Sequence, residues 1–197
     1  SKSITTYLVE SMNSKSDYDI ALVLYTIYKD QYVCINISQG IWYEFQTNKW
    51  KEIDSGTTLR THLSEEVHNL YICEIRDCTH KMGDITNDNP NADKLKGEYE
   101  KMIQNALKIC DKIKDNGKKS NIMKEAAHLF HNSEFIEKMD QNPYLLGFKN
   151  GIIDFKEKRF RQGYPEDYIT KSTKMDYIPK ENIKNYDVKK QEIIDFM

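Results

Sequence analysis

Two apolar runs on either side of an Asn-Gly pair constrain the fold of this chain more than any other feature. The pair is Asn150-Gly151; the run LLGF precedes it and the run IIDF follows it. Both residues tolerate positive φ, so an Asn-Gly pair between apolar runs is a strong signal for a tight hairpin. A charged break and the triplet RFR follow. We therefore predict a β-hairpin within residues 142–173 whose turn uses positive φ at Asn150 and Gly151.

A second β region is predicted at residues 31–53. The segment QYVCINI is rich in β-branched residues, and the segments IWYEF and WKEI follow short turns. This pattern indicates a small antiparallel meander that carries both tryptophans. Its aromatic side chains are expected in the core of the sheet, although they also suit a platform on which single-stranded bases stack; they are Trp42, Tyr43, Phe45 and Trp50.

Helical periodicity accounts for most of the remaining chain. The segment IALVLYTIYKD follows Asp17 and Asp19, either of which would cap this helix and favour its positive N-terminal end. A further helix, LRTHLSEEVHNLYICEIRD, follows a capping segment at residues 54–58. The predicted class is α+β: a mostly helical fold with the small antiparallel meander near the N-terminus and the β-hairpin near the C-terminus.

A long helix is predicted over residues 92–115, with Gly117 ending it as a C-terminal glycine does and Ser120 starting the next helix. The tetrapeptide GKKS in this region superficially resembles a phosphate-binding loop. Such a loop needs a Gly five positions before its second Gly, and Ser or Thr directly after the Lys. Lys112 and Lys119 occupy those positions. The chain is therefore predicted to hold no ATP site and no cofactor of its own.

The elements group into three predicted segments. Residues 1–140 form a helical domain that includes the meander at 31–53, residues 141–180 form a β-hairpin subdomain, and residues 181–197 form a linker that starts a following module. The chain begins without Met and stops within a helical pattern, so we expect a piece of a longer protein. No apolar run approaches the roughly 20 residues of a membrane span, which excludes a membrane partner. Four scattered cysteines in 197 residues favour a reducing, intracellular compartment.

Charge is distributed unevenly around a net value of −2. Residues 1–90 carry 8 basic and 13 acidic side chains, whereas residues 91–174 carry 17 basic and 13 acidic ones. This asymmetry permits a basic face on the second half. The candidate DNA contacts are basic side chains near the hairpin and after the long helix: Lys149, Lys156, Lys158, Arg159, Arg161, Lys118 and Lys119.

Metal binding has little support in the sequence. Cys73, Cys78 and His80, like His128 and His131, lack the close Cys pairs that are typical of structural zinc sites. No metal site and no catalytic residue are assigned on this basis.

Asp17 and Asp19 raise an alternative function, because paired carboxylates hold the divalent ions of phosphoryl transfer. Polymerase and primase acids usually lie within or at the end of a strand, whereas the run after Asp19 has helical periodicity. Helix capping is the favoured role. A metal-dependent, primase-like nucleotidyl transferase using both acids stays as the alternative.

Three segments resemble one protein family. They are the helix leading into WYEFQTNKWKEID, the helix LRTHLSEEVHNLY, and, most specifically, the hairpin region in which NGIIDF is followed by PEDY and a Thr/Ser-rich strand. Together they resemble the domain that precedes the superfamily-III helicase, of the AAA+ class, in poxvirus-like and giant-virus primase-helicases. The C-terminal domain of phage and plasmid replication primases is similar. The resemblance rests on residues with expected structural roles: Trp42, Trp50, Asn150, Gly151 and Asp154.

The resemblance implies a non-catalytic accessory domain of a viral DNA-replication protein, placed between primase and helicase modules of the same chain. It implies a hexameric parent that uses Mg-ATP in the downstream motor, self-association within that hexamer, and contact with single-stranded or forked DNA. The implied location is the host-cell cytoplasm, where such viruses replicate. A third hypothesis is a protein-interaction module whose hairpin docks a replication partner.

Overall fold

The computed structural model describes residues 2–86 and 88–196. Its contacts divide the chain into two compact units. The first comprises Ser1–Glu44 and Lys51–Ile136, and the second comprises Phe45–Trp50 and Glu137–Met197. One small three-stranded sheet lies near each end of a mostly helical chain, which confirms the α+β class. The predicted segment boundaries after residues 140 and 180 stay predictions.

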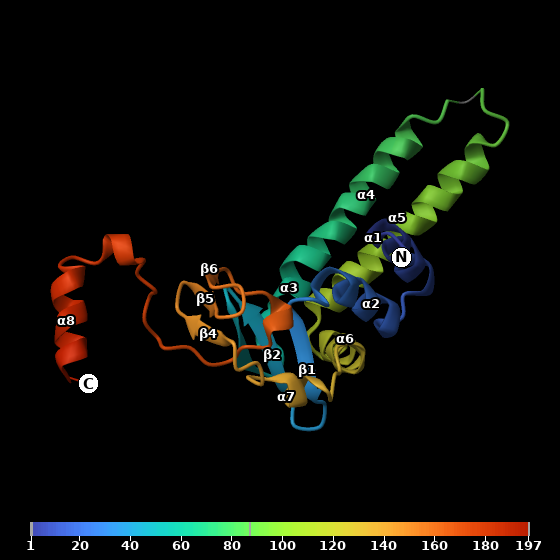
Figure 1. Ribbon diagram of the computed structural model, residues 1–197. Coiled ribbons are helices and arrows are strands. Elements are labelled where there is room, and N and C mark those ends of the chain that lie inside the picture. The colour runs from blue at the N-terminus through green and yellow to red at the C-terminus, as the bar shows by residue number, and fades with distance from the viewer. Residues whose placement is uncertain (1, 87, 197) are drawn as a thin grey trace. The chain divides into compact units, whose positions relative to one another are not determined.

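Helices dominate the first unit. They are α1 (Ile4–Ser14), α2 (Asp17–Tyr28), α3 (Thr57–His62), α4 (His68–Gly83), α5 (Ala92–Lys114) and α6 (Asn116–Leu129), with a π-helical turn at Leu63–Val67. α4 and α5 run side by side as a long antiparallel pair (Figure 1). α2 packs against α1 and α6, so the short helices gather around one end of this pair. α1 was not predicted from the sequence.

The core of the first unit joins α1, α2, α4, α5 and α6. Ile20, Leu24 and Ile109 are completely buried, as the helical apolar periodicity of their segments requires. One polar contact lies inside this core: the hydroxyls of Ser11 and Tyr71 are 2.7 Å apart and both residues are fully buried. Burial raises the pKa of the Tyr71 hydroxyl. This hydrogen bond therefore ties α1 to α4.

The start of α2 differs from the prediction. Ser16 is the N-cap, and its hydroxyl accepts a hydrogen bond from the Asp19 N–H at 3.0 Å. Asp19 returns the contact, because its carboxylate accepts from the Ser16 hydroxyl at 2.8 Å. Asp17 lies in the first turn, where an acid still suits the positive helix end. The expectation that Asp17 or Asp19 supplies the cap was therefore wrong, because a serine hydroxyl one residue earlier fills that position.

The junction of α5 and α6 also differs from the prediction. α5 ends at Lys114, Asp115 adopts an extended conformation, and its side chain accepts a hydrogen bond from the Lys118 N–H at 2.8 Å. α6 thus begins at Asn116, four residues before the predicted start at Ser120. Gly117 lies in the first turn of α6 without a positive φ. It is no C-terminal glycine, because the Asp115 cap restarts the helix at once.

The segment at residues 54–58 leads into a helix as predicted, but none of its side chains caps that helix. Gly56 is the N-cap of α3, with φ +61° and no capping side chain. A Cβ on Gly56 would lie 3.2 Å from the Trp42 ring, so glycine serves both the left-handed backbone and the close packing. Helix α3 then passes into the π-helical turn before α4, and the predicted single helix is divided there.

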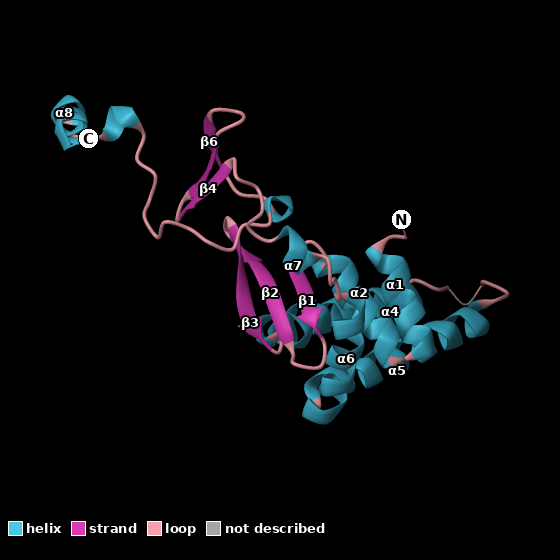
Figure 2. Ribbon diagram, turned by 60° about the horizontal axis from the view of Figure 1, so that its bottom comes forward, coloured by secondary structure: helices cyan, strands magenta, loops and turns pink. Residues whose placement is uncertain are grey.

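The predicted meander is confirmed as β1 (Tyr32–Asn36), β2 (Ile41–Gln46) and β3 (Lys49–Asp54), in the order β1-β2-β3 (Figure 2). β1 pairs antiparallel with β2, and Cys34 lies opposite Trp42. The tip of the β2–β3 hairpin, Phe45–Trp50, makes its contacts with the second unit and belongs to it.

The predicted hairpin is confirmed as β4 (Leu145–Phe148) and β5 (Gly151–Asp154), and β6 (Arg159–Arg161) adds a third antiparallel strand. Its turn differs from the prediction: Phe148 pairs with Gly151, so Lys149-Asn150 forms the turn. Neither Asn150 nor Gly151 has a positive φ.

Other constraints explain this Asn-Gly pair. Asn150 donates from Nδ2 to the Tyr177 carbonyl at 3.0 Å and accepts from the Tyr177 N–H at 2.8 Å. A Cβ on Gly151 would lie 2.5 Å from Cζ of Phe160. The pair is therefore determined by a side-chain clamp and by a close approach of neighbouring strands.

The chain after β6 packs back onto the second unit. The backbone N–H of Trp50 donates to the Ile169 carbonyl at 2.7 Å, and the backbone N–H of Thr173 donates to the Gly147 carbonyl at 2.9 Å. The segment at residues 169–175 thus connects the β2–β3 tip to β4. The helix expected near the C-terminus is confirmed as α8 (Tyr186–Phe196). Within the described ranges, every helix is too short or too polar to cross a membrane.

Candidate nucleic-acid interface

Arg161 is held by two carboxylates of the second unit. Its Nη1 and Nη2 each donate to Asp167 at 2.8 Å, and its Nη2 donates to Asp154 at 3.2 Å. The Arg161 side chain is 13% exposed, and those of Asp154 and Asp167 are 12% and 10% exposed. The hydrogen bonds to Asp167 raise the pKa of Arg161. This candidate DNA contact therefore has its guanidinium engaged inside the protein.

Asp154 also shapes the turn between β5 and β6. Its Oδ1 accepts hydrogen bonds from the backbone N–H groups of Lys156 at 3.0 Å and Glu157 at 3.1 Å. The Glu157 N–H is the main cause that lowers the pKa of Asp154, and Arg161 adds to it. Lys158 completes the turn with a φ of +52°. In the structure, Asp154 thus holds the backbone of a basic turn in place.

The basic turn at residues 156–159 is exposed. The ammonium group of Lys156 lies 4.5 Å from the centroid of the Tyr144 ring, and Arg159 forms an ion pair with Glu157 at 2.5 Å. Lys158 has no hydrogen bond or ion pair with any described residue. The turn therefore presents three cations and one carboxylate to solvent.

Lys149 lies at the opposite end of the same sheet. Successive turns of an antiparallel meander alternate between its two ends, so the β4–β5 turn is remote from the β5–β6 turn. Lys149 lines a groove of about 390 Å³ together with residues of the β2–β3 tip and of the segment at 169–175. The structure therefore separates Lys149 from Lys156, Lys158 and Arg159, which the sequence places around one hairpin.

Lys118 and Lys119 belong to the first unit, at the start of α6. Lys119 donates to the Ser64 hydroxyl at 2.8 Å, and Lys114 donates to the Ser64 carbonyl at 2.8 Å. Burial, and then the charges of Arg60 and Lys114, lower the pKa of Lys119. This is a second, independent basic cluster around the π-helical turn.

The aromatic residues of the first sheet are mainly structural. Trp42 and Trp50 are 3% and 5% exposed, and Trp50 donates its indole N–H to the Pro165 carbonyl at 2.8 Å. Phe45 contacts Trp50 edge-on with ring centroids 5.5 Å apart. The expected core role of both tryptophans is what the structure shows, and little of either ring is accessible to a base.

Asp17 and Asp19 have structural partners. Asp17 accepts from Lys112 at 2.8 Å, and Asp19 accepts from the hydroxyls of Ser14 and Ser16. In residues 2–86 and 88–196, no three His, Cys, Asp or Glu side chains are grouped so as to hold a metal ion.

A profile of the family described as D5 N terminal like matches residues 21–196. The match begins inside α2, covers both sheets and ends in α8. The chain belongs to the D5 N terminal like family. The predicted resemblance, which named the domain before the helicase in viral primase-helicases, is thereby confirmed.

Several viral proteins are similar to this D5 N terminal like chain. A protein of Acanthamoeba polyphaga mimivirus that is named as a helicase is 34% identical over 171 residues, or 87% of this chain and 17% of that protein. A Frog virus 3 protein named as a helicase is 28% identical, over 81% of this chain and 19% of the relative. An African swine fever virus protein named as a primase is 26% identical, over 88% and 19%. The chain thus spans less than a fifth of the length of these relatives.

Sequence patterns missed three residues that the structure brings to Lys149: Lys49, Phe148 and Lys174. Lys49 lies about a hundred positions before Lys149 in the sequence. No local pattern joins these positions, because the contact depends on the 169–175 segment packing between two turns. The charge excess of residues 91–174 hinted at Lys149 and Lys174, whereas Lys49 was noticed only as a cation beside the aromatic residues of the first sheet.

Proposed function

We propose that this domain is a non-catalytic accessory module of a viral DNA-replication primase-helicase. It precedes an ATP-dependent helicase motor in the parent chain, helps the protomers of that parent assemble, and contacts DNA. The observation that carries the proposal is the family match over residues 21–196, combined with relatives that are named as helicases and primases. Because the chain spans under a fifth of those relatives, the Mg-ATP chemistry is assigned to other modules of the parent.

The basic turn at residues 156–159 supports a DNA contact. Its cations are exposed, and Asp154 fixes its backbone through two N–H groups. A pre-ordered turn loses little conformational freedom when it meets a phosphate backbone. Lys158 and Arg159 are therefore the side chains to test, whereas Arg161 is part of the scaffold.

The test is a titration of labelled single-stranded and forked DNA with the purified chain, by fluorescence anisotropy across a salt series. Phosphate contacts make the affinity fall with salt, with a slope that changes by about 0.7 for each phosphate neutralised on a single strand. The variant K158A/R159A is expected to flatten that slope. The matched control is K94A/K101A on the exposed side of α5, which removes the same charge from the first unit. Absence of binding at low salt would contradict the DNA contact and would favour the protein-interaction hypothesis.

The assembly part of the proposal is supported by α8. Val188, Ile193 and Ile194 on this helix are 59%, 62% and 52% exposed. Exposed apolar side chains that cluster on one element favour a protein contact. Sedimentation velocity of the chain at increasing concentration is expected to show self-association. The variant I193E/I194E is expected to reduce it. V9E, at a position packed against the helical core, is the control for an effect of unfolding. A monomer at every concentration would remove self-association of this domain from the proposal.

A further inference from the structure

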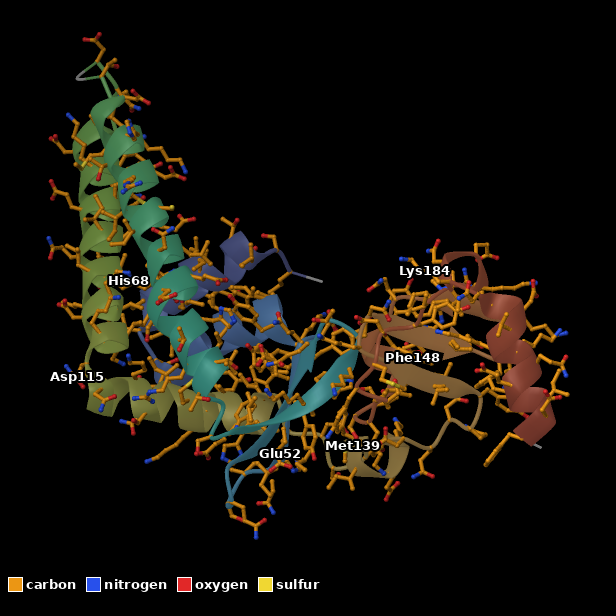
Figure 3. All side chains as sticks on the ribbon, turned by 90° about the vertical axis from the view of Figure 1, so that its left-hand side faces the viewer. Glu52, His68, Asp115, Met139, Phe148 and Lys184 are labelled. Carbon is orange, nitrogen blue, oxygen red and sulfur yellow. The ribbon has the colours of Figure 1, made fainter. Side chains whose placement is uncertain are left out.

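The groove beside Lys149 is built from three separate segments of the second unit. The β2–β3 tip contributes Asn48 and Lys49, the end of β4 contributes Phe148 and Lys149, and the following segment contributes Ser172 and Lys174. Figure 3 marks Phe148 on the ribbon of the second sheet. Three backbone hydrogen bonds hold these segments together, including one from the Lys149 N–H to the Met175 carbonyl at 2.9 Å. The groove is therefore a product of the fold and has a volume of about 390 Å³.

The charge of the groove has one sign. None of its lining residues is acidic, and three are lysines. Lys149 and Lys174 are exposed, and the described part of the chain offers their ammonium groups no carboxylate partner. The nearest acid in sequence, Asp176, is exposed and does not line the groove. Three cations around a concave surface without a counter-charge create a positive potential that attracts anions.

Hydrogen-bond donors lie between the lysines. Lys49 donates to the Ser172 hydroxyl at 3.2 Å, which leaves the Ser172 O–H free to point to another acceptor. Asn48 is 4% exposed, and its Oδ1 accepts from the Gly163 N–H at 2.7 Å. Its Nδ2 has no acceptor among the described residues. Buried N–H groups are almost always paired in native proteins, so this amide donor is open to an acceptor supplied by a water molecule or by a ligand in the groove.

One aromatic ring adjoins these donors. Phe148 lines the groove and is only partly buried, and its ring makes a T-shaped contact with the Tyr177 ring at a centroid distance of 5.6 Å. A positive groove next to an accessible aromatic ring is the combination with which proteins bind single-stranded nucleic acid without sequence preference. The tryptophans of the first sheet, by contrast, are buried.

From these features we infer that this groove binds single-stranded nucleic acid, with backbone phosphates at Lys49, Lys149 and Lys174 and one base against Phe148. The inference rests on the proposed replication function and names a surface distinct from the basic turn at residues 156–159. The two surfaces lie at opposite ends of the β4-β5-β6 sheet. A strand held in the groove would therefore contact this domain independently of the basic turn.

The experiment compares K149A/K174A with the control K94A/K101A in anisotropy titrations of a labelled single-stranded oligonucleotide across a salt series. Both variants lose two exposed lysines, and Lys94 and Lys101 lie on α5. The groove variant is expected to flatten the salt slope by about 1.4, since each lost phosphate contact changes it by about 0.7. F148L is expected to weaken binding roughly tenfold without changing the slope, because stacking is lost and charge is kept.

Two titration outcomes and one NMR measurement would each overturn part of this inference. Binding by K149A/K174A that equals the control overturns the groove and leaves the proposed function with the basic turn. Absence of oligonucleotide binding by the unmodified chain overturns both. The third measurement follows the side-chain amide of Asn48 by NMR during addition of oligonucleotide or of inorganic phosphate at equal phosphate concentration. A shift that is as large with inorganic phosphate as with the oligonucleotide identifies a small-anion site and overturns nucleic-acid binding.

Discussion

The guanidinium of Arg161 and the carboxylate of Asp167 meet through two parallel hydrogen bonds of 2.8 Å each. The same arginine contacts Asp154, which orders the basic turn. In a sequence, Arg159 and Arg161 look equivalent, because both flank Phe160 in a basic hairpin. The structure gives them different roles: Arg159 faces solvent, and Arg161 holds β6 to the chain that follows it.

Replacement of Arg161 is expected to destabilise the second unit. R161A leaves two carboxylates with little solvent and no counter-charge, and breaking such a pair costs about 3 kcal/mol. Urea unfolding measures the change in the free energy of unfolding. R159A is the matched control, because its partner Glu157 is 51% exposed and surface ion pairs contribute under about 1 kcal/mol. Equal stability of both variants would contradict the assigned scaffold role.

Gly163 is expected to tolerate no side chain. A Cβ there would lie 2.3 Å from the backbone oxygen of Asn48, so G163A must displace the β2–β3 tip. Forced displacement of this kind costs about 2 kcal/mol. G97A is the opposite case, since nothing lies within 4 Å of its Cβ and alanine favours the helix α5 by about 0.5 to 1 kcal/mol. Thermal unfolding should therefore shift in opposite directions for the two variants.

Acid is expected to destabilise the second unit in a defined range. Backbone N–H groups and Arg161 lower the pKa of Asp154. Burial raises the pKa of Asp140, but hydrogen bonds from Thr170 outweigh burial, so that its pKa is lowered as well. A lowered pKa in the folded state means that the stabilisation is complete above the unfolded value of about 4 and is lost as pH falls through the folded value. Urea unfolding between pH 7 and pH 3 measures this loss, and D154N and D140N should each flatten the profile. A profile unchanged in both variants would disprove the linkage.

The buried contact between Ser11 and Tyr71 is expected to stabilise the first unit. Y71F removes one hydroxyl and leaves the Ser11 hydroxyl with its bond to the Leu8 carbonyl at 2.7 Å. The expected loss is about 1 kcal/mol in the free energy of unfolding. Y144F is the control, since Tyr144 is 47% exposed. A loss confined to Y71F would confirm the link between α1 and α4.

Asp17 and Asp19 are expected to act in stability alone. D17N breaks a partly exposed ion pair with Lys112, worth up to about 1 kcal/mol, and D19N weakens the reciprocal cap with Ser16. Incorporation of nucleotides in the presence of Mg²⁺ or Mn²⁺ is the second readout. Metal-dependent incorporation by the unmodified chain that D17N/D19N abolishes would establish the nucleotidyl-transferase alternative instead.

Local patterns in the sequence located most of the helices and both sheets, but not α1 (Ile4–Ser14). Apolar spacing located α2, α5 and α8, and β-branched runs between turn residues located both sheets, because these signals lie within a few residues of each other. The same signals gave the α+β class and the basic residues worth testing. They failed at Gly117 and Asn150-Gly151, where one residue type serves several purposes and the surrounding contacts select among them.

Tertiary structure alone decided which charges can meet a ligand. Ion pairs with Asp154 and Asp167 occupy the guanidinium of Arg161. Lys149 lies far from the basic turn because successive turns of the β4-β5-β6 sheet are at opposite ends. Lys49 and Lys174 join Lys149 through backbone hydrogen bonds between segments that are far apart in the sequence. The availability of a charged side chain depends on what packs around it, and that packing is a long-range property that no local sequence pattern specifies.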